Sequence, residues 1–175
     1  MTADVRTLTT TALMAAVICV LGPLSVPIGP VPISLTNFAI YITMYVLDAK
    51  RGTIAYLIYM LIGLAGLPVF SGFSGGAGKL FGPTGGYIIG FLPMAFVIGV
   101  VIDRYWKNRL VCILTMEAAT WIPYLMGTGW LAAQTGMTFQ AALGVGVLPF
   151  IVVDLCKIIA AAFLGPLVKI RLIVR

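Results

Sequence analysis

The chain has 175 residues, of which 61% are hydrophobic and 9% are charged, with a formal net charge of +6. Since soluble domains average about 25% charged residues, so few charges cannot cover a domain of this size in water. The absence of histidine excludes a Ser-His-Asp triad, a histidine-bound zinc and the usual general base near neutral pH. We therefore expect an integral membrane protein that has no catalytic centre, metal site, cofactor or nucleic-acid partner.

Six apolar windows predict transmembrane helices, because a membrane-spanning helix needs about 20 mostly apolar residues. The first two divide one uncharged run, which the proline-rich stretch from Gly22 to Pro32 interrupts. The windows are Leu8 to Val26, Leu35 to Leu47, Gly52 to Phe70, Tyr87 to Ile102, Leu110 to Gly127 and Val145 to Val168. They predict an all-α bundle of six transmembrane helices that forms a single membrane domain over residues 1–175.

The cations predict the orientation of this bundle. In an alternating topology, Lys79 is the one cation in the loops on one side, and Lys157 lies inside the last helix. The remaining cations fall in segments on the other side: Arg6, Lys50, Arg51, Arg104, Lys107, Arg109, Lys169, Arg171 and Arg175. By the positive-inside rule, both termini of this multi-pass protein are cytoplasmic.

Two connections, from Gly22 to Pro32 and from Gly66 to Gly86, are rich in glycine, proline and apolar residues. Irregular backbone is tolerated at membrane depth where protein covers it or where it lines a cavity. We expect both connections to pack as lids over a pocket on the outer side; ordinary ordered loops are the alternative. The second one contains Gly78-Lys79 but lacks the first glycine and the final Ser or Thr of a phosphate-binding P-loop.

Asp154 and Lys157 are three residues apart in the last window, so they share one helix face. Ionisable groups at this depth cost several kcal/mol unless they are paired or hydrated, so they normally face the bundle interior and mark a functional site. A carboxylate beside an ammonium suits a ligand that presents both N–H and C=O groups. The alternative is a structural ion pair that locks the last helix to its neighbours, with Glu117 as a further partner.

Small and aromatic residues add weaker signals. Ala12 and Ala16 form a small-xxx-small pattern that lets another helix approach closely, and the spacing alone does not decide whether that helix belongs to a partner. Trp121, Tyr124 and Trp130 fit an aromatic belt at the outer interface. Stacking of Trp121 and Tyr124 on a ligand is the alternative.

Four ordered blocks resemble the BioY family over nearly the whole chain. They are Val31-Pro32-Ile33-Ser34-Leu35, Gly66-Leu67-Pro68-Val69-Phe70, Gly82-Pro83-Thr84-Gly85-Gly86-Tyr87 with Gly90-Phe91, and Val147-Leu148-Pro149-Phe150 with Asp154 and Lys157. The resemblance implies the biotin-specific S component of an energy-coupling-factor (ECF) transporter in a bacterial or archaeal cell membrane. Such a subunit is not an enzyme; it binds biotin with high affinity near its outer face. It associates with a transmembrane T subunit and two ABC-type ATPases.

The resemblance also implies roles for the candidate residues. Asp154 would accept from the ureido N–H of biotin and Lys157 would donate to the ureido carbonyl, so that ligand alone completes the pair. Val31, Phe70 and Phe150 would enclose the bicyclic ring.

For the carboxylate of biotin, the expected partners are Lys79 and the backbone N–H groups of Gly75 and Gly76. The Ala-x-x-x-Ala motif of the family, matched by Ala12 and Ala16, is associated with docking of the T subunit.

The chain departs from the family at Thr36-Asn37, where Gln-Thr is more frequent, so no ligand contact is carried over to these two positions. Two other functions remain open. One is an S component for another vitamin, such as riboflavin or thiamin. The other is an intramembrane enzyme built on Asp154, Glu117 and Lys157, for which the sequence offers no nucleophile motif.

Overall fold

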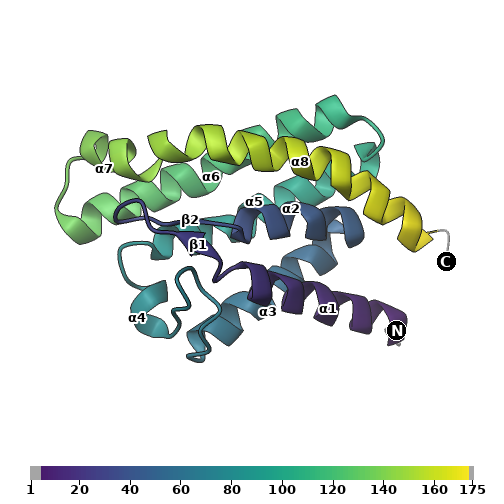
Figure 1. The fold of residues 1–175 in the computed structure, drawn as a ribbon, viewed down its shortest axis with the longest axis horizontal. Helices are drawn as coiled ribbons and strands as arrows, with labels where there is room; N and C mark the ends of the chain where they lie inside the picture. Colours follow the sequence, from purple (N-terminus) through teal and green to yellow (C-terminus); the bar gives the residue numbers. More distant parts are fainter. Residues whose placement is uncertain (1–4, 174–175) are drawn as a thin grey trace.

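The computed structural model describes residues 5–173, which fold into a helical bundle with one short β-hairpin (Figure 1). The elements are α1 (Val5–Leu21), β1 (Ser25–Val26), β2 (Ile33–Ser34), α2 (Thr36–Val46), α3 (Ala49–Leu64), α4 (Ala77–Leu80), α5 (Gly85–Tyr105), α6 (Arg109–Thr135), α7 (Phe139–Gly146) and α8 (Leu148–Ile173). Arg175 of the expected basic C-terminus lies outside the described residues.

Side-chain caps set several helix boundaries. The Asp48 carboxylate accepts from the backbone N–H of Arg51 at the start of α3, and the Asn108 side chain caps α6 in the same way. These bonds satisfy donors that the first turn of a helix leaves unpaired. α6 ends where Gly136 adopts a left-handed conformation with φ of 73°, which costs a glycine little.

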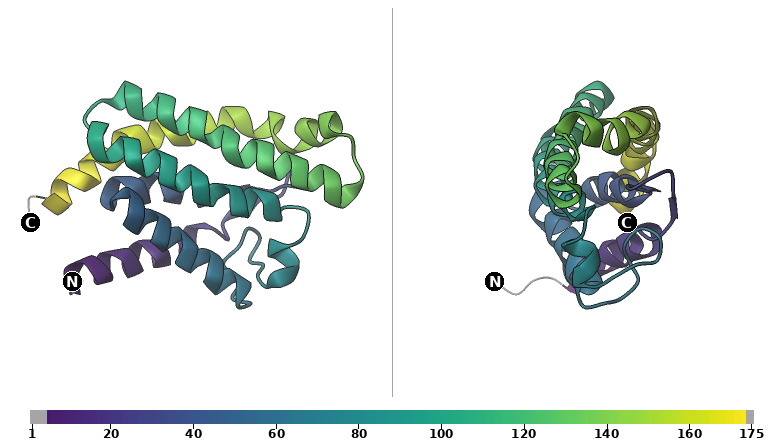
Figure 2. Two further views of the ribbon diagram at one scale, coloured as in Figure 1. Left: turned by 180° about the vertical axis from the view of Figure 1, so that it is seen from behind. Right: turned by 90° about the vertical axis from the view of Figure 1, so that its left-hand side faces the viewer.

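The helix α2 lies at the centre of the bundle. In the end-on view of Figure 2 it sits inside the ring formed by the longer helices, and it packs against α5 and α8. Its residues Tyr41, Met44 and Tyr45 are fully buried. An uncharged, mostly apolar sequence is what such a fully enclosed helix requires.

Each of the six apolar windows contains a helix, but two windows run too far. The residues at their ends, Val26 and Phe70, lie in β1 and in the α3–α4 connection rather than in helices. Hydropathy cannot distinguish an apolar hairpin or loop from a helix end, because it reports the apolar character of the residues and not the conformation of their backbone. The last window spans the break at Val147 between α7 and α8, and the separate helix α7 was not predicted.

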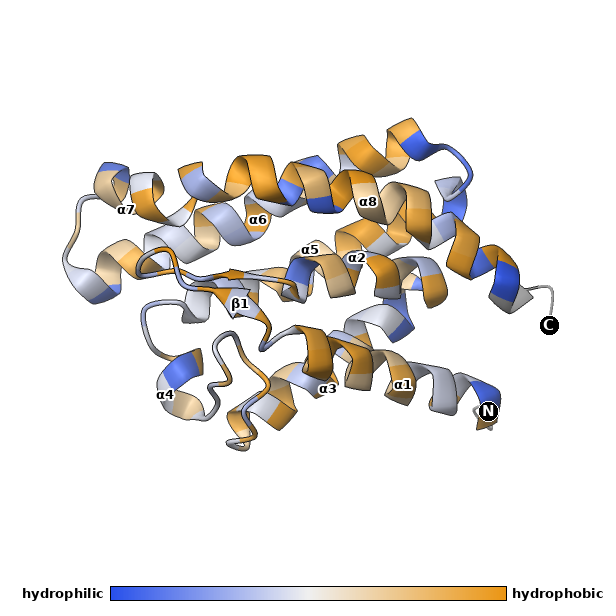
Figure 3. Cartoon of the chain, in the orientation of Figure 1, coloured by the Kyte–Doolittle hydropathy of each residue, from blue (hydrophilic) through white to orange (hydrophobic). Residues whose placement is uncertain are grey.

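Among the described helices, α5, α6 and α8 are long and apolar enough to cross a membrane, and α1 is a shorter apolar helix. Large apolar side chains such as Leu13, Leu114 and Val152 are exposed on the sides of the bundle. Figure 3 shows hydrophilic segments gathered at the start of α1, the end of α8 and the α5–α6 connection, all at the same end. This distribution is that of a protein whose sides face lipid.

Two glycines of α5, Gly86 and Gly90, allow close packing against α6. A Cβ atom at Gly90 would lie 2.7 Å from the Cα atom of Pro123, and a Cβ atom at Gly86 would lie 2.3 Å from the Cβ atom of Trp130. The two helices therefore touch at backbone distance, which a larger residue would prevent.

We expect Gly90→Ala to lower the free energy of unfolding by about 1–3 kcal/mol, because backbone atoms of α6 cannot move aside locally. Thermal unfolding in detergent measures this loss. Gly129→Ala on α6 is the matched control, since its Cβ would meet no atom within 4 Å. Equal melting temperatures for the two variants would show that the close contact between α5 and α6 does not contribute to stability.

Candidate functional site

A cavity with about 640 Å³ of empty space, its open mouth included, lies between the hairpin and the helices of the bundle. The lining residues are Val31, Pro32, Ser34, Thr36, Asn37, Tyr56, Tyr59, Ser71, Thr84, Tyr87, Ile88, Phe91, Pro123, Tyr124, Gly146, Phe150, Asp154 and Lys157. They come from six helices (α2, α3, α5, α6, α7 and α8), from β2 and from both unusual connections.

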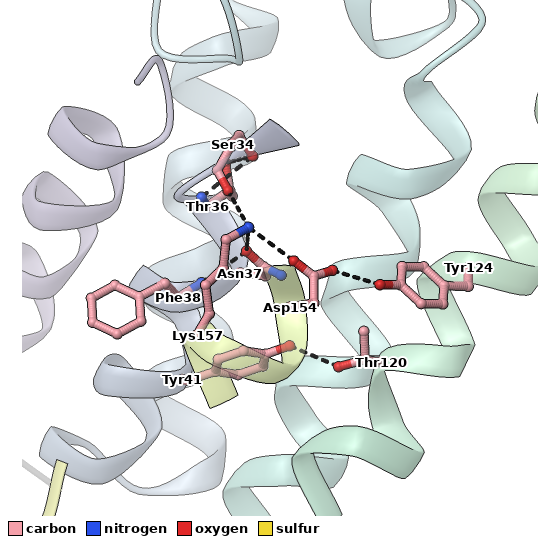
Figure 4. A network of polar contacts seen from close by, with 9 residues as sticks. All are labelled: Ser34, Thr36, Asn37, Phe38, Tyr41, Thr120, Tyr124, Asp154 and Lys157. Carbon is pink, nitrogen blue, oxygen red and sulfur yellow. Dashed lines mark hydrogen bonds and ion pairs between the residues drawn. The ribbon is translucent and has the colours of Figure 1, made fainter. Parts of the chain in front are cut away.

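The charged pair of this cavity is Asp154 and Lys157, one turn apart on α8 (Figure 4). Lys157 Nζ lies 2.9 Å from Asp154 Oδ1, and the two residues are 9% and 5% exposed. Charges this deeply buried require both pairing and further hydrogen bonds, because the surrounding apolar groups do not solvate them.

Lys157 donates to two further acceptors on other elements. Its Nζ atom lies 2.7 Å from the main-chain oxygen of Ser34 in β2 and 3.0 Å from Asn37 Oδ1 in the first turn of α2. The three acceptors match the three N–H donors of an ammonium group. Lys157 thus joins α8 to the hairpin and to the central helix.

Asp154 is held from the opposite side by α6. Its Oδ2 atom accepts a hydrogen bond from the Tyr124 hydroxyl at 2.7 Å. One turn away on α6, Thr120 donates to Met116 O, which leaves its oxygen to accept from the Tyr41 hydroxyl at 2.7 Å. Figure 4 shows the Tyr124–Asp154 and Tyr41–Thr120 bonds, which join α6 to α8 and to α2.

This geometry corrects the expectation that only a ligand completes the Asp154–Lys157 pair. Within the described residues, Lys157 already has three acceptors, and each carboxylate oxygen of Asp154 has a donor. Protein groups are available because β2 and α2 bring a carbonyl and an amide beside the ammonium, which helix spacing on α8 alone could not reveal. A ligand therefore has to exchange with existing bonds rather than fill a vacancy.

The aromatic wall of the cavity is fixed by contacts behind it. Tyr56 donates its hydroxyl to Ile88 O at 2.7 Å and packs edge-on against Phe91 with ring centroids 6.2 Å apart. Tyr59 packs edge-on against Phe70, with centroids 5.5 Å apart. The wall therefore presents a preformed apolar surface.

The expected site residues divide into two groups. Val31, Phe150, Asp154 and Lys157 line the cavity. Phe70 does not; it is fully buried behind Tyr59, where it supports the wall from outside.

Gly75, Gly76 and Lys79 also lie outside the cavity lining. The N–H of Gly76 donates to Gly63 O at 2.7 Å, so this donor serves the loop itself rather than an anion. Lys79 is half-buried in α4, and this burial lowers the pKa of its ammonium group. It is therefore not a fully solvated loop charge.

Both unusual connections reach the cavity, through Val31 and Pro32 from the first and Ser71 and Thr84 from the second. They are also joined to each other, since Gly72 N donates to Pro23 O at 3.1 Å. This arrangement agrees with their predicted role as packed covers.

Sequence reasoning missed Asn37, Ser34 and the bonding role of Tyr124. Tyr124 is 6% exposed and bonded to Asp154, so its placement in an interfacial belt was wrong. Its spacing from Thr120 on α6 places both toward the interior, a signal that the belt interpretation overlooked. For the main-chain oxygen of Ser34, no side-chain pattern could have given a signal.

The remaining candidates lie on other surfaces. Ala12 and Ala16 are exposed on α1, whereas Ala15 is buried between them. Glu117 is half-buried on α6 and is not among the lining residues. The bonds that the structure gives Asp154 go to Lys157 and Tyr124, so Glu117 is not the partner that the structural alternative required.

The bundle and its buried polar pocket define an α-helical membrane protein with a site for a small molecule. A solved structure described as the S-component for biotin from an ECF-type ABC transporter has the same fold, with a TM-score of 0.88 and 33% identity. The match covers 97% of this chain and 94% of the other.

The chain belongs to the BioY family, whose sequence profile matches residues 1–173. The biotin transporter BioY of Thermotoga maritima is 39% identical over 161 residues, which cover 91% of this chain and 94% of the relative. The probable biotin transporter BioY of Pyrococcus horikoshii is 41% identical over 154 residues, covering 88% and 90%. The resemblance read from the ordered sequence blocks is thereby confirmed.

We expect Lys157→Met to lower the free energy of unfolding by about 3–5 kcal/mol, because it leaves Asp154 as a buried charge held only by Tyr124. Asp154→Asn should cost less, since the ammonium keeps Ser34 O and Asn37 Oδ1. The double variant should recover part of the loss, which thermal unfolding in detergent measures as a coupling energy. Lys79→Met, outside the cavity, is the control; purely additive losses in the double variant would refute the coupling.

Proposed function

We propose that this chain is the biotin-binding S component of an ECF-type vitamin uptake transporter. The observation that carries the proposal is the buried Asp154–Lys157 pair in a cavity lined by aromatic side chains, within a chain of the BioY family. The chain is then a substrate-binding transport subunit and not an enzyme.

The chemistry of biotin fits the polar groups of the cavity. A carboxylate offers about four acceptor positions, of which Lys157 and Tyr124 use two at Asp154, so the ureido N–H groups have acceptors left. Lys157 meets the ureido carbonyl by exchanging one of its three bonds, and the freed Asn37 or Ser34 group then faces the ligand. The rings of Tyr56, Tyr59 and Phe150 enclose the apolar thioether bicycle.

We propose that the carboxylate of biotin points toward the connection between α3 and α5. Ser71 and Thr84 of this connection line the cavity and supply hydroxyl donors, and Lys79 in α4 supplies the positive charge. This placement moves the donor role from the Gly75-Gly76 backbone to these hydroxyls, because the N–H of Gly76 already has an acceptor.

The proposed topology has six membrane crossings, by α1, α2, α3, α5, α6 and α8, with both termini in the cytoplasm of a bacterial or archaeal cell. It is supported by the hydrophilic end of the bundle, where α1 starts and α8 ends (Figure 3). The short helix α2 spans only part of the core, and the β1–β2 hairpin continues its path.

The partners follow from the proposed class. Uptake requires a T subunit and two ABC-type ATPases that hydrolyse ATP, and Ala12 and Ala16 form the surface of α1 on which the T subunit docks. Their exposure supports this role, since a helix surface of small side chains lets a partner helix approach closely.

Asp154→Asn and Lys157→Ala should each weaken biotin binding by at least about 2 kcal/mol, or about 30-fold, because each removes a buried charge-assisted contact. Titration calorimetry on the purified chain measures the affinity. Glu117→Gln is the matched control for charge loss and should bind biotin within about threefold of the parent. Normal binding by both cavity variants would refute the ureido assignment, and preferential binding of riboflavin or thiamin would refute biotin as the ligand.

Ala16→Trp should leave biotin binding intact but abolish assembly with the T subunit and biotin uptake, because the indole blocks close helix approach. Co-purification with the T subunit and radiolabelled uptake in cells measure the two effects. Leu13→Trp introduces the same group on an exposed position of α1 that is already bulky, so it should assemble normally. Retained uptake by Ala16→Trp would remove this surface from the docking site.

A further inference from the structure

A second cavity lies at the end of the bundle where α1 starts and α8 ends. It is formed by the first turns of α1, the α2–α3 connection and the last turns of α8. Its lining residues are Arg6, Thr7, Thr10, Val46, Leu47, Asp48, Arg51 and Lys169. None of them lines the proposed biotin cavity.

Three cations line this cavity. Arg6, Arg51 and Lys169 come from three different segments, and Asp48 is the carboxylate among the described lining residues. Asp48 pairs with Arg51: its Oδ2 atom lies 3.2 Å from Arg51 Nε, and its Oδ1 atom accepts a hydrogen bond from the backbone N–H of Arg51. Guanidinium and ammonium groups converging on one concavity are what recognition of a phosphate group requires.

The third cation is held in place. Lys169 is half-buried, and its Nζ atom lies 5.8 Å from the ring centroid of Trp106, which joins the end of α8 to the end of α5. A positioned cation loses less side-chain freedom on binding an anion than a solvated one does.

Apolar groups border the same cavity. Val46 and Leu47 form part of its lining, and on the same ends of α1 and α8 the side chains of Leu8, Leu167 and Ile170 are exposed. A free anion would gain nothing from these groups. A ligand with an anionic head and apolar chains can interact with both the cations and the apolar side chains.

The position of the cavity in the bundle also combines polar and apolar surroundings. In Figure 3, the hydrophilic segments at this end adjoin the apolar sides of the bundle, which is the level at which lipid headgroups lie. Basic pockets between helices on the cytoplasmic side of membrane proteins suit anionic headgroups.

We propose that this cavity binds the phosphate headgroup of an anionic phospholipid, with its acyl chains against the apolar sides of α1 and α8. The assignment to the cytoplasmic leaflet rests on the proposed topology, whereas the lipid site itself does not depend on the identity of the transported vitamin.

The test compares two double variants of the full chain in detergent, titrated with phosphatidylglycerol and followed by native mass spectrometry. R51Q/K169Q removes two lining cations. K50Q/K107Q is the matched control, because it removes the same charge, Lys50 adjoins Arg51, and Lys107 also lies over the Trp106 ring at 5.5 Å. We expect the dissociation constant for phosphatidylglycerol to rise about tenfold in the first variant and less than twofold in the control.

Four further measurements define the outcome. Phosphatidylcholine should bind the parent chain at least about tenfold more weakly, and millimolar inorganic phosphate should not displace phosphatidylglycerol. Displacement by phosphate would overturn the lipid assignment in favour of an ion site, and equal weakening in both double variants would overturn the site. Loss of T-subunit assembly with unchanged lipid affinity in R51Q/K169Q would instead make the cavity a protein-docking site. Biotin binding by both variants checks folding, so failure here is distinct from failure of the proposed function.

Discussion

The site depends on the hydrogen bonds that the ammonium group of Lys157 donates. A buried cation is tolerated in apolar surroundings only when its donors are all used, and here the acceptors come from α8, β2 and α2. The requirement fixes three elements relative to one another before any ligand arrives. Binding then becomes an exchange of hydrogen bonds in a formed pocket, which lowers the entropy lost when a small molecule is captured.

Other contacts reinforce this fixed frame from outside. The close approach of α5 and α6 at Gly90 brings Tyr87 and Tyr124 into the lining of one cavity, and Phe70 packs against Tyr59. The two connections that form the covers are bonded to each other at Gly72 and Pro23, and Trp130 of α6 donates to the main-chain oxygen of Gly82. Rigid walls with irregular covers suit a protein that must enclose its ligand and later release it.

The sequence predicted much of this protein, and its gaps have physical causes. Hydropathy located a helix in each apolar window, and the depth of Asp154 and Lys157 identified the centre of the cavity because charges in lipid are too costly to be incidental. Helix periodicity could not place Asn37 beside Lys157, since that contact joins residues 120 positions apart. Likewise, glycine content suggested an anion site at Gly76 whose N–H the fold assigns to Gly63 O.

The contact between Lys157 and Ser34 uses a main-chain oxygen. Every amino acid carries this oxygen, so exchange of the Ser34 side chain alone leaves the acceptor in place as long as the β1–β2 pairing persists. Homologous proteins can therefore diverge at this position without losing the anchor of their charged residue. Comparison of side chains across such proteins would then underestimate how much of the binding machinery they share.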